Sequence, residues 1–214
     1  MPLLLLGLDN TLIDRIGAFR TWAGGFLAEI QAPEHDLDWL LSVDADGQTS
    51  AWDIAEAVKD RYGLRASLFD IVAVVRNGVL ANVRLDPLVA CALSIAEDAG
   101  YVPVVVTNGE TAQQEAKLAR TGLDRYVANW VISEEAGVRK PHPHIFMMAA
   151  ERVHMRLQGA WVVGDDPEAD IGGAAELGAP SVWLRRGRKW SDQRFGPTRT
   201  AENVIGAVAA VLAG

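Results

Sequence analysis

The chain has 214 residues, half of them hydrophobic, and a net charge of −8 at pH 7. This length is enough for one sizeable core, or for one core with a small satellite domain. The negative charge argues against a general affinity for nucleic acid or anionic lipid. The single cysteine, Cys91, excludes an internal disulfide, and its apolar, helical surroundings predict a buried thiol.

The first residues, "MPLLLL", have no basic segment and run directly into charged residues, so they do not predict a secretion signal. No stretch approaches the roughly 20 apolar residues that a membrane-spanning helix needs. We therefore expect a cytoplasmic protein that has no membrane partner.

The opening apolar run, "PLLLLGL", predicts a buried strand that ends in the acidic turn Asp9-Asn10-Thr11. The pattern then changes and indicates only helices, at 16–30, 36–43, 49–63 and 68–80. Asp86 suits the N-cap of a further helix and Pro87 its first turn, so we expect the chain to re-enter the core there.

The second half alternates short apolar runs with amphipathic stretches. Strands are predicted at 101–109, 129–133, 159–166 and 180–184. Helices are predicted at 110–122, 141–155, 167–177 and 201–213. Continuous apolar strands that alternate with helices indicate a parallel sheet covered on both faces. The predicted fold class is therefore α/β, with a Rossmann-like three-layer core formed by residues 1–14 and 83–214, and with a helical domain inserted at 15–82.

Polar residues follow the predicted strands at the points where ligands bind in doubly wound sheets. They are Asp9, Asn10, Thr11, Thr107, Asn108, Gly109, Lys140, Asp165, Asp166 and Asp170. Hydroxyl and ammonium groups bind phosphoryl oxygens, and carboxylates bind a hard cation such as Mg²⁺. Each residue alone has a structural explanation, such as a turn cap or a solvated lysine. Their recurrence at successive strand ends favours a site for phosphate beside a divalent metal.

Four segments, "LDNTL", "VVVTNG", "RKPHPHIF" and "VVGDDPEADIGGAAELG", resemble in order the four motifs of the haloacid dehalogenase (HAD) superfamily. The helical insertion resembles the C1 cap of that superfamily, which closes over the active site. The sequence is most similar to the phosphatase-like branch that contains phosphoglycolate phosphatases and nucleotidases. The resemblance implies the HAD fold more specifically than it implies one reaction.

The resemblance also implies roles for individual residues. Thr107 matches the phosphate-binding hydroxyl, and Lys140 matches the lysine that neutralises nucleophile and phosphate. Asp9 matches the general acid and base, whose main-chain carbonyl also binds the metal. Asp165 is implied to bind the metal, and Asp170 to support the metal site or Lys140. Thr11 is implied to support the first loop. Ligand contact is implied for Asn10, Thr11, Asn108 and Gly109.

The first motif departs from the family pattern Asp-x-Asp-x-Thr, because this chain reads Gly7-Leu8-Asp9-Asn10-Thr11. In the family the first aspartate attacks the substrate to form a covalent aspartyl intermediate, and glycine has no atom that can replace it. Because that carboxylate is normally also a Mg²⁺ ligand, we expect weakened metal affinity. Asp9 begins about 6–7 Å further along the strand and does not easily substitute.

Four interpretations of Gly7 compete. The protein is a binding or scaffolding member of the family, or an enzyme that uses Asp9 as acid or base in elimination, isomerisation or cyclisation. Alternatively, the chain is an engineered nucleophile knockout, or a water molecule in the emptied space attacks phosphate directly. The other positions of the site carry the residue types of the family motifs. We therefore favour a HAD-like hydrolase scaffold whose phosphatase activity is absent or greatly reduced.

The expected ligand is a small anionic or phosphorylated molecule, and the expected oligomeric state is a monomer or homodimer. The basic segment "RRGRK", at residues 185–189, follows the last strong strand pattern. We interpret it as a solvated loop, since an acidic chain with one short basic segment gives little support for nucleic-acid binding.

Overall fold

The computed structural model describes all residues, 1–214, and the chain divides into two compact units. The first unit consists of Met1–Ile13 and Leu85–Gly214. The second unit is the intervening segment, Asp14–Arg84.

The first unit is built on a six-stranded parallel sheet, which confirms the predicted α/β fold class. Its strands are β1 (Leu3–Leu6), β2 (Val102–Thr107), β3 (Asn129–Ile132), β4 (Trp161–Gly164), β5 (Ser181–Leu184) and β6 (Arg199–Ala201). The spatial order is β3-β2-β1-β4-β5-β6. Strand β6 was not predicted, because its three residues, "RTA", are too few and too polar to form a recognisable pattern.

Strand β1 lies at the centre of the sheet, where Leu5 is paired with Val104 of β2 and with Val162 of β4. The chain proceeds to β2 and β3 on one side of β1, and to β4, β5 and β6 on the other. Ligands of doubly wound sheets bind at such a switch point, beyond the carboxyl ends of the strands. The residues that follow β1 are therefore placed at the position of the fold that is best suited to a site.

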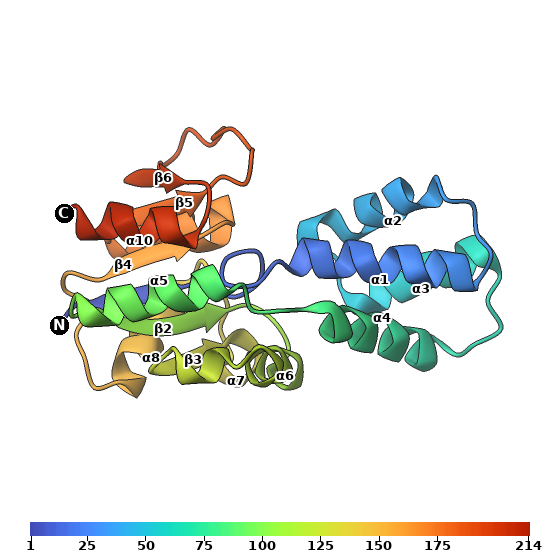
Figure 1. Ribbon diagram of the computed structural model, residues 1–214, viewed down its shortest axis with the longest axis horizontal. Helices are drawn as coiled ribbons and strands as arrows, with labels where there is room; N and C mark the ends of the chain where they lie inside the picture. The colour runs from blue at the N-terminus through green and yellow to red at the C-terminus, as the bar shows by residue number, and fades with distance from the viewer. The chain divides into compact units, whose positions relative to one another are not determined.

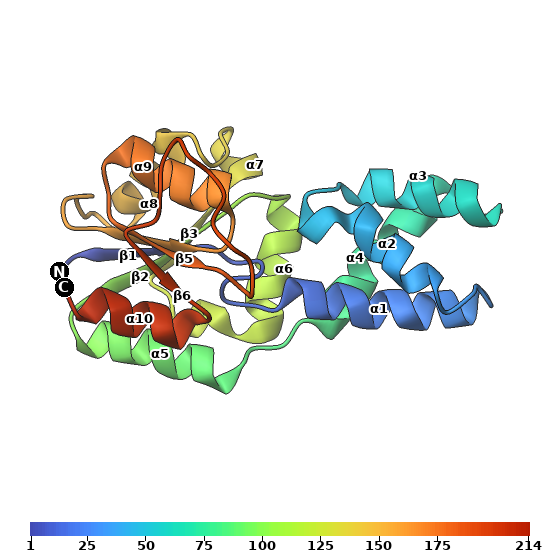
Figure 2. The same ribbon diagram turned by 90° about the horizontal axis from the view of Figure 1, so that it is seen from above.

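Helices cover both faces of the sheet (Figures 1 and 2). Helices α5 (Pro87–Asp98) and α10 (Val204–Leu212) lie side by side on one face. Helices α8 (Pro143–Arg152) and α9 (Gly173–Leu177) lie on the other face. The remaining elements of this unit are α6 (Thr111–Thr121), η2 (Leu123–Arg125), α7 (Ser133–Ala136) and η3 (Pro167–Gly172).

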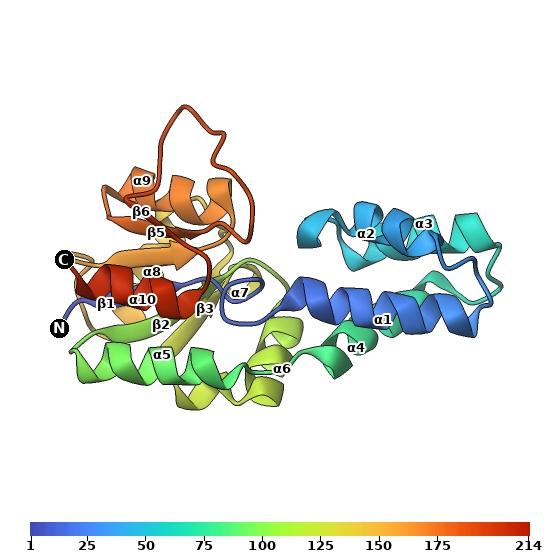
Figure 3. The same ribbon diagram turned by 45° about the horizontal axis from the view of Figure 1, so that its top comes forward.

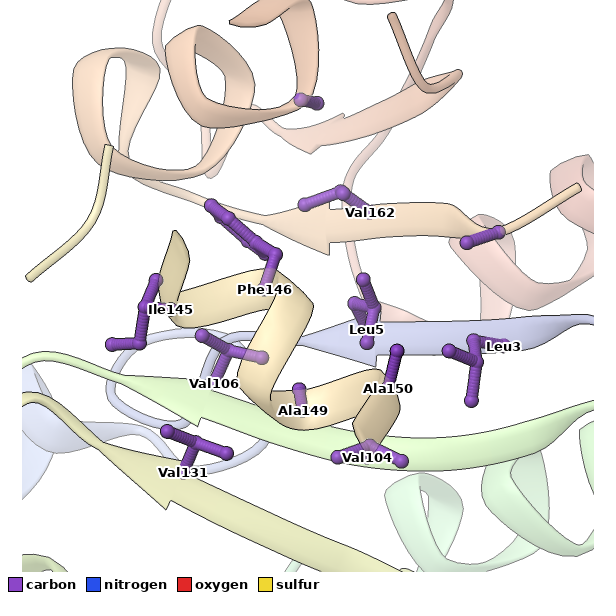
Figure 4. Packing of buried hydrophobic residues seen from close by; sticks show 12 residues of the cluster. Leu3, Leu5, Val104, Val106, Val131, Ile145, Phe146, Ala149, Ala150 and Val162 are labelled. Carbon is purple, nitrogen blue, oxygen red and sulfur yellow. The ribbon is translucent and has the colours of Figure 1, made fainter. Parts of the chain in front are cut away.

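The hydrophobic core beneath α8 holds this arrangement together (Figure 4). Phe146 and Ala149 of α8 pack with Leu5 of β1 and with Val104 and Val106 of β2, and all of these side chains are at most 1% exposed. Burial of one large apolar side chain contributes about 1.5–3 kcal/mol to folding. The carboxyl ends of β1, β2 and β4 are thus fixed to one rigid layer.

Cys91 is exposed, so the expectation of a buried thiol was wrong. Helix α5 is apolar on more than one side, and the sequence pattern therefore does not reveal which side faces the core. Ala92, Leu93 and Ala96 face inward, whereas Leu88, Cys91 and Ile95 remain exposed.

The second unit contains the helices α1 (Arg15–Glu29), α2 (Asp36–Asp44), α3 (Ala51–Tyr62) and α4 (Leu68–Asn82), with the short turn η1 (Ala45–Gly47). The four predicted helices of this segment are confirmed. Helices α1 and α4 lie side by side (Figure 3). A Cβ atom on Gly78 of α4 would lie 1.9 Å from the ring of Trp22, so only glycine permits this approach of α1 and α4.

No single helix has both the length and the apolar composition of a membrane span. The bent pair α4 and α5 meets those criteria when taken together, by length and composition alone.

Candidate functional site

The loop after β1 folds tightly around one carbonyl group. Leu8 O accepts hydrogen bonds from the N–H groups of Thr11, Leu12 and Ile13, at 3.3, 2.9 and 3.1 Å. Asn10 has a left-handed backbone conformation, with φ of 57°, which asparagine tolerates better than most residues. The turn holds Asp9 and Thr11 at the carboxyl end of β1.

Asp9 forms an ion pair with a lysine that the motifs do not contain. Lys117 of α6 places its Nζ atom 2.8 and 2.7 Å from the two carboxylate oxygens of Asp9. The Lys117 side chain is 9% exposed, so its charge is largely withdrawn from water and is directed at Asp9. Asp9, Lys117, Gln114 and Thr107 are called the Asp9 cluster below.

Gln114 connects the two motif residues of the Asp9 cluster. Its Nε2 atom donates to Thr107 Oγ1 at 2.6 Å and to Asp9 Oδ2 at 3.0 Å. Gln114 is 2% exposed and lies one helical turn before Lys117, so both side chains project from the same side of α6. Helix α6 therefore positions the hydroxyl of Thr107 beside the carboxylate of Asp9.

Asn108 joins the second motif to the third. Its side chain accepts a hydrogen bond from Lys140 N at 2.8 Å and donates one to Lys140 O at 3.1 Å. The adjacent Gly109 has φ of 151° and donates its N–H to Ser133 Oγ at 3.0 Å. These contacts fix the backbone of Lys140 at the carboxyl end of β2.

Lys140 is paired with the last carboxylate of the fourth motif. Its Nζ atom lies 2.6 Å from Asp170 Oδ1, and the two side chains are 7% and 3% exposed. The other oxygen of Asp170 accepts a hydrogen bond from Asp166 N at 3.1 Å. A Cβ atom on Gly164 would lie 2.1 Å from the carboxyl group of Asp170, so glycine at the end of β4 makes room for this pair.

Asp165 lies beneath two arginines of the segment 185–189. Arg186 Nη1 and Arg188 Nη2 each lie 3.1 Å from Asp165 Oδ2, and Thr11 Oγ1 donates to Oδ1 at 3.5 Å. Burial, reinforced by the negative charge of Asp170, raises the pKa of Asp165 to about 6, although both arginines act in the opposite direction. The interpretation of this segment as a solvated loop was wrong for Arg186 and Arg188.

Arg188 is fixed by further contacts. Its Nη2 atom also donates to Asp165 O at 2.7 Å and to Leu184 O at 3.3 Å, while its Nε atom donates to Arg185 O at 3.2 Å. Asp165 O accepts another hydrogen bond, at 2.9 Å, from the indole of Trp183. The position of the guanidinium is therefore determined by the backbone of the strand ends as well as by the carboxylate.

The space at Gly7 is bordered by Thr11. A Cβ atom on Gly7 would lie 2.8 Å from Thr11 Oγ1, 3.3 Å from Thr11 Cβ and 3.5 Å from Asp170 Oδ2. The Gly7 N–H donates to Val163 O at 2.9 Å, which continues the pairing of β1 with β4. Any side chain at this position would require Thr11 to move.

The structure brings the predicted residues together in three contacts, which are Asp9 with Thr107 through Gln114, Lys140 with Asp170, and Thr11 with Asp165. No group of three or more acidic, histidine or cysteine residues suits a metal ion. Metal binding by Asp9, Asp165 and Asp170 stays a prediction.

Gln114, Lys117, Arg186 and Arg188 were not identified from the sequence. Gln114 and Lys117 could have been found from their spacing of three residues in the predicted helix directly after the second motif, because this spacing places both on one side of the helix. A signal for the arginines was their position after β5, whose carboxyl end must open at the same edge of the parallel sheet as that of β4.

A family model described as haloacid dehalogenase-like hydrolase matches residues 1–178 of the chain. Among curated proteins, the glyceraldehyde 3-phosphate phosphatase of Pyrococcus furiosus is 36% identical over 89 residues, which are 42% of this chain and 37% of the relative. The pyrimidine 5'-nucleotidase YjjG of Escherichia coli is 37% identical over 101 residues, 47% of this chain and 45% of the relative. The match to each of these relatives therefore spans less than half of the relative's length.

Solved structures with the same fold cover nearly the whole chain. The HAD-hydrolase YfnB of Bacillus subtilis, determined with bound magnesium, has a TM-score of 0.77 at 21% identity and covers 98% of both chains. The L-2-haloacid dehalogenase of Xanthobacter autotrophicus, determined with chloropropionic acid covalently bound, has a TM-score of 0.77 at 15% identity over 99% of this chain and 98% of that one. Identities this low establish the fold alone.

Proposed function

Because the chain belongs to the haloacid dehalogenase-like hydrolase family, we propose that it is a hydrolase scaffold without the catalytic nucleophile. In this proposal it binds a small anionic or phosphorylated molecule at the carboxyl ends of the strands, and its phosphatase activity is absent or greatly reduced. Segment 15–82 is the helical cap of the family in the same proposal.

The observation that carries the proposal is the contrast between Gly7 and its surroundings. Gly7 supplies no carboxylate to attack a substrate, so no aspartyl intermediate can form there. The hydroxyl of Thr107 is nevertheless held by Gln114, and Lys140 is held by Asn108 and Asp170. A hydroxyl and an ammonium group in fixed positions suit an anion.

The first test is hydrolysis of p-nitrophenyl phosphate in the presence of Mg²⁺. The chain is expected to show no turnover above that of its Lys140→Met variant. The matched gain-of-function variant is Gly7→Asp, combined with Thr11→Ser so that the hydroxyl can rotate away from the new Cβ. If the unmodified chain hydrolyses the ester measurably and as fast as this double variant, the assignment of Gly7 as the missing nucleophile is wrong.

The second test is binding of inorganic phosphate, measured by isothermal titration calorimetry. The chain is expected to bind phosphate, and the Lys140→Met variant is expected to bind it about tenfold or more weakly, because a charged donor is lost. The absence of any phosphate binding by the unmodified chain would contradict the binding half of the proposal.

A second candidate function is proton transfer by Asp9 in a step that needs no covalent intermediate. The observation in its favour is accessibility, since the Asp9 side chain is 27% exposed while those of Asp165 and Asp170 are 9% and 3% exposed. This candidate predicts turnover of an anionic substrate that is lost in Asp9→Asn, although phosphate binding persists. Equal turnover by Asp9→Asn and the unmodified chain would exclude it.

A further inference from the structure

Three motif carboxylates at the strand ends are paired with cations of this chain. Asp9 is paired with Lys117 and Asp170 with Lys140, at 2.7 and 2.6 Å. Asp165 is paired with two arginines, which come from the long loop between β5 and β6 (Figure 3). Asp165 and Asp170, the carboxylates to which the resemblance assigns the metal site, are thus already neutralised within the chain.

These residues do not fit a magnesium ion. Mg²⁺ requires near-octahedral oxygen ligands at about 2.0–2.1 Å and is usually bound through one or two carboxylates. Here Asp165 Oδ2 is shared by Arg186 and Arg188, and Gly7 contributes no carboxylate. A dication bound to Asp165 would lie close to two guanidinium charges, and like charges at such separations repel strongly in a buried site.

The arginines are held in place rather than loosely solvated. Arg188 donates to the carbonyl groups of Asp165, Leu184 and Arg185, and its guanidinium lies 5.5 Å from the ring centre of Trp183. The side chains of Arg186 and Arg188 are 22% and 35% exposed. Arg185, in the same segment, instead pairs with Glu202 and is 52% exposed. The segment therefore directs two of its arginines specifically to Asp165.

We propose that Arg186 and Arg188 form an arginine clamp that takes the place of a divalent cation at Asp165, so that the strand-end site binds its anion without metal. The charges agree with this assignment. The three paired carboxylates, of Asp9, Asp165 and Asp170, are in contact with four cations, those of Lys117, Lys140, Arg186 and Arg188. The planar, weakly hydrated guanidinium group suits such a buried position beside carboxylate and phosphate groups.

The test of the clamp is direct binding of Mn²⁺, which replaces Mg²⁺ as a probe and is followed by electron paramagnetic resonance. The unmodified chain is expected to show no saturable site tighter than about 1 mM, the weak end of protein sites for hard cations. The Arg186→Gln/Arg188→Gln variant is expected to gain affinity of about tenfold or more, because two repelling charges are removed. Arg185→Gln is the matched control and should behave as the unmodified chain.

Two outcomes of the Mn²⁺ titration would overturn the clamp. One is a site of submillimolar affinity in the unmodified chain that disappears in Asp165→Asn, a result that does not depend on folding of the arginine variant. The other is an arginine variant with an unchanged circular dichroism spectrum that binds Mn²⁺ no better than the unmodified chain.

A second measurement rests on the proposed function, because it requires phosphate to bind. The phosphate affinity of the unmodified chain should be the same, within about twofold, in EDTA and in millimolar Mg²⁺. In Arg186→Gln/Arg188→Gln, affinity should fall in EDTA and recover in Mg²⁺. Phosphate affinity of the unmodified chain that requires Mg²⁺ contradicts the clamp. If no phosphate binds at all, the proposed function fails, while the Mn²⁺ titration still decides the clamp.

Discussion

The side chains of Asp36 in the helical unit and Asp165 at the strand ends are both buried, at 4% and 9% exposure, yet their pKa values move in opposite directions. Hydrogen bonds from Arg61 at 2.6 Å and Tyr62 at 2.8 Å hold the pKa of Asp36 below its usual value. At Asp165, burial and the nearby Asp170 raise the pKa to about 6.

The surroundings of the two carboxylates distinguish a structural carboxylate from a candidate functional one. Around Asp36, strong donors from one helix stabilise the charged form, and they outweigh the opposing effect of burial. Around Asp165, two arginines act against burial and against a second carboxylate that comes from the same motif. Charges that conflict in this way are typical of functional sites, whereas a satisfied ion pair is sufficiently explained by folding.

The largest predicted effect comes from breaking the buried pair at the strand ends. Asp170→Ala leaves Lys140 buried without its carboxylate, and loss of one partner of a buried pair costs about 3–5 kcal/mol of unfolding free energy. Urea denaturation followed by tryptophan fluorescence measures this loss. Asp36→Ala should cost less, because Arg61 is 39% exposed and can turn to solvent.

The matched control for Asp170→Ala is the apolar pair Lys140→Met/Asp170→Leu, which removes both charges. Replacement of a buried ion pair by apolar side chains is often neutral or stabilising. A double variant that is as unstable as Asp170→Ala would show that the loss arises from packing around Gly164 and not from the unpaired charge.

The second effect depends on pH. Because Asp165 binds its proton more tightly in the folded chain than in the unfolded chain, its stabilising contribution is present at low pH and is lost as the pH rises from about 4 to about 6. The loss reaches at most about 3 kcal/mol, since each pKa unit corresponds to about 1.4 kcal/mol. The measurement is the difference in unfolding free energy between the unmodified chain and Asp165→Asn across this pH range.

Asp36 gives the opposite pH dependence in the same experiment. Because its pKa is lowered, it contributes stability above the unfolded pKa, and this contribution is lost as the pH falls below that value. Asp36→Asn should therefore differ most from the unmodified chain at neutral pH. If the unfolding free energies of Asp36→Asn and Asp165→Asn, each compared with the unmodified chain, change with pH in the same direction, the two carboxylates do not differ as proposed.

The positions of these residues could be predicted from sequence only in part. Parallel strands end at a common edge, so apolar runs followed by Asp9, Thr107 and Asp165 were enough to place these three residues at that edge. The pairing of Asp9 with Lys117 depends on the rotational phase of α6, which the alternation of polar and apolar residues did not specify.

The contacts of Arg186 and Arg188 with Asp165 could not be predicted from the sequence either, for a different physical reason. The segment between β5 and β6 has no regular period, so the directions of its side chains depend on the path of the loop and on contacts such as Arg188 with Leu184 O. The same limitation applies to Thr11, whose approach to Gly7 follows from the turn around Leu8 O.

A smaller effect is predicted at Gly7. Gly7→Ala should destabilise the chain by about 1–2 kcal/mol, because the new Cβ would lie 2.8 Å from Thr11 Oγ1 and overpacking costs this much. In the background Thr11→Ala the hydroxyl is gone, and Gly7→Ala should cost less than half as much. Urea denaturation of the four proteins in this cycle gives the coupling between the two positions. Equal costs in both backgrounds would show that Thr11 does not fill the space beside Gly7.

The smallest predicted effect is that of a helix-cap variant in the helical unit. Ser67 caps α4 of the helical unit by accepting a hydrogen bond from Asp70 N at 3.2 Å, so Ser67→Ala should cost about 1 kcal/mol of unfolding free energy. Phosphate affinity should not change, because Ser67 lies in the helical unit and the anion-binding residues lie in the sheet unit. Calorimetric titration of Ser67→Ala with phosphate checks this. Weakened phosphate binding by this variant would mean that the helical unit contributes to the anion site, and that the site cannot be assigned to the strand ends alone.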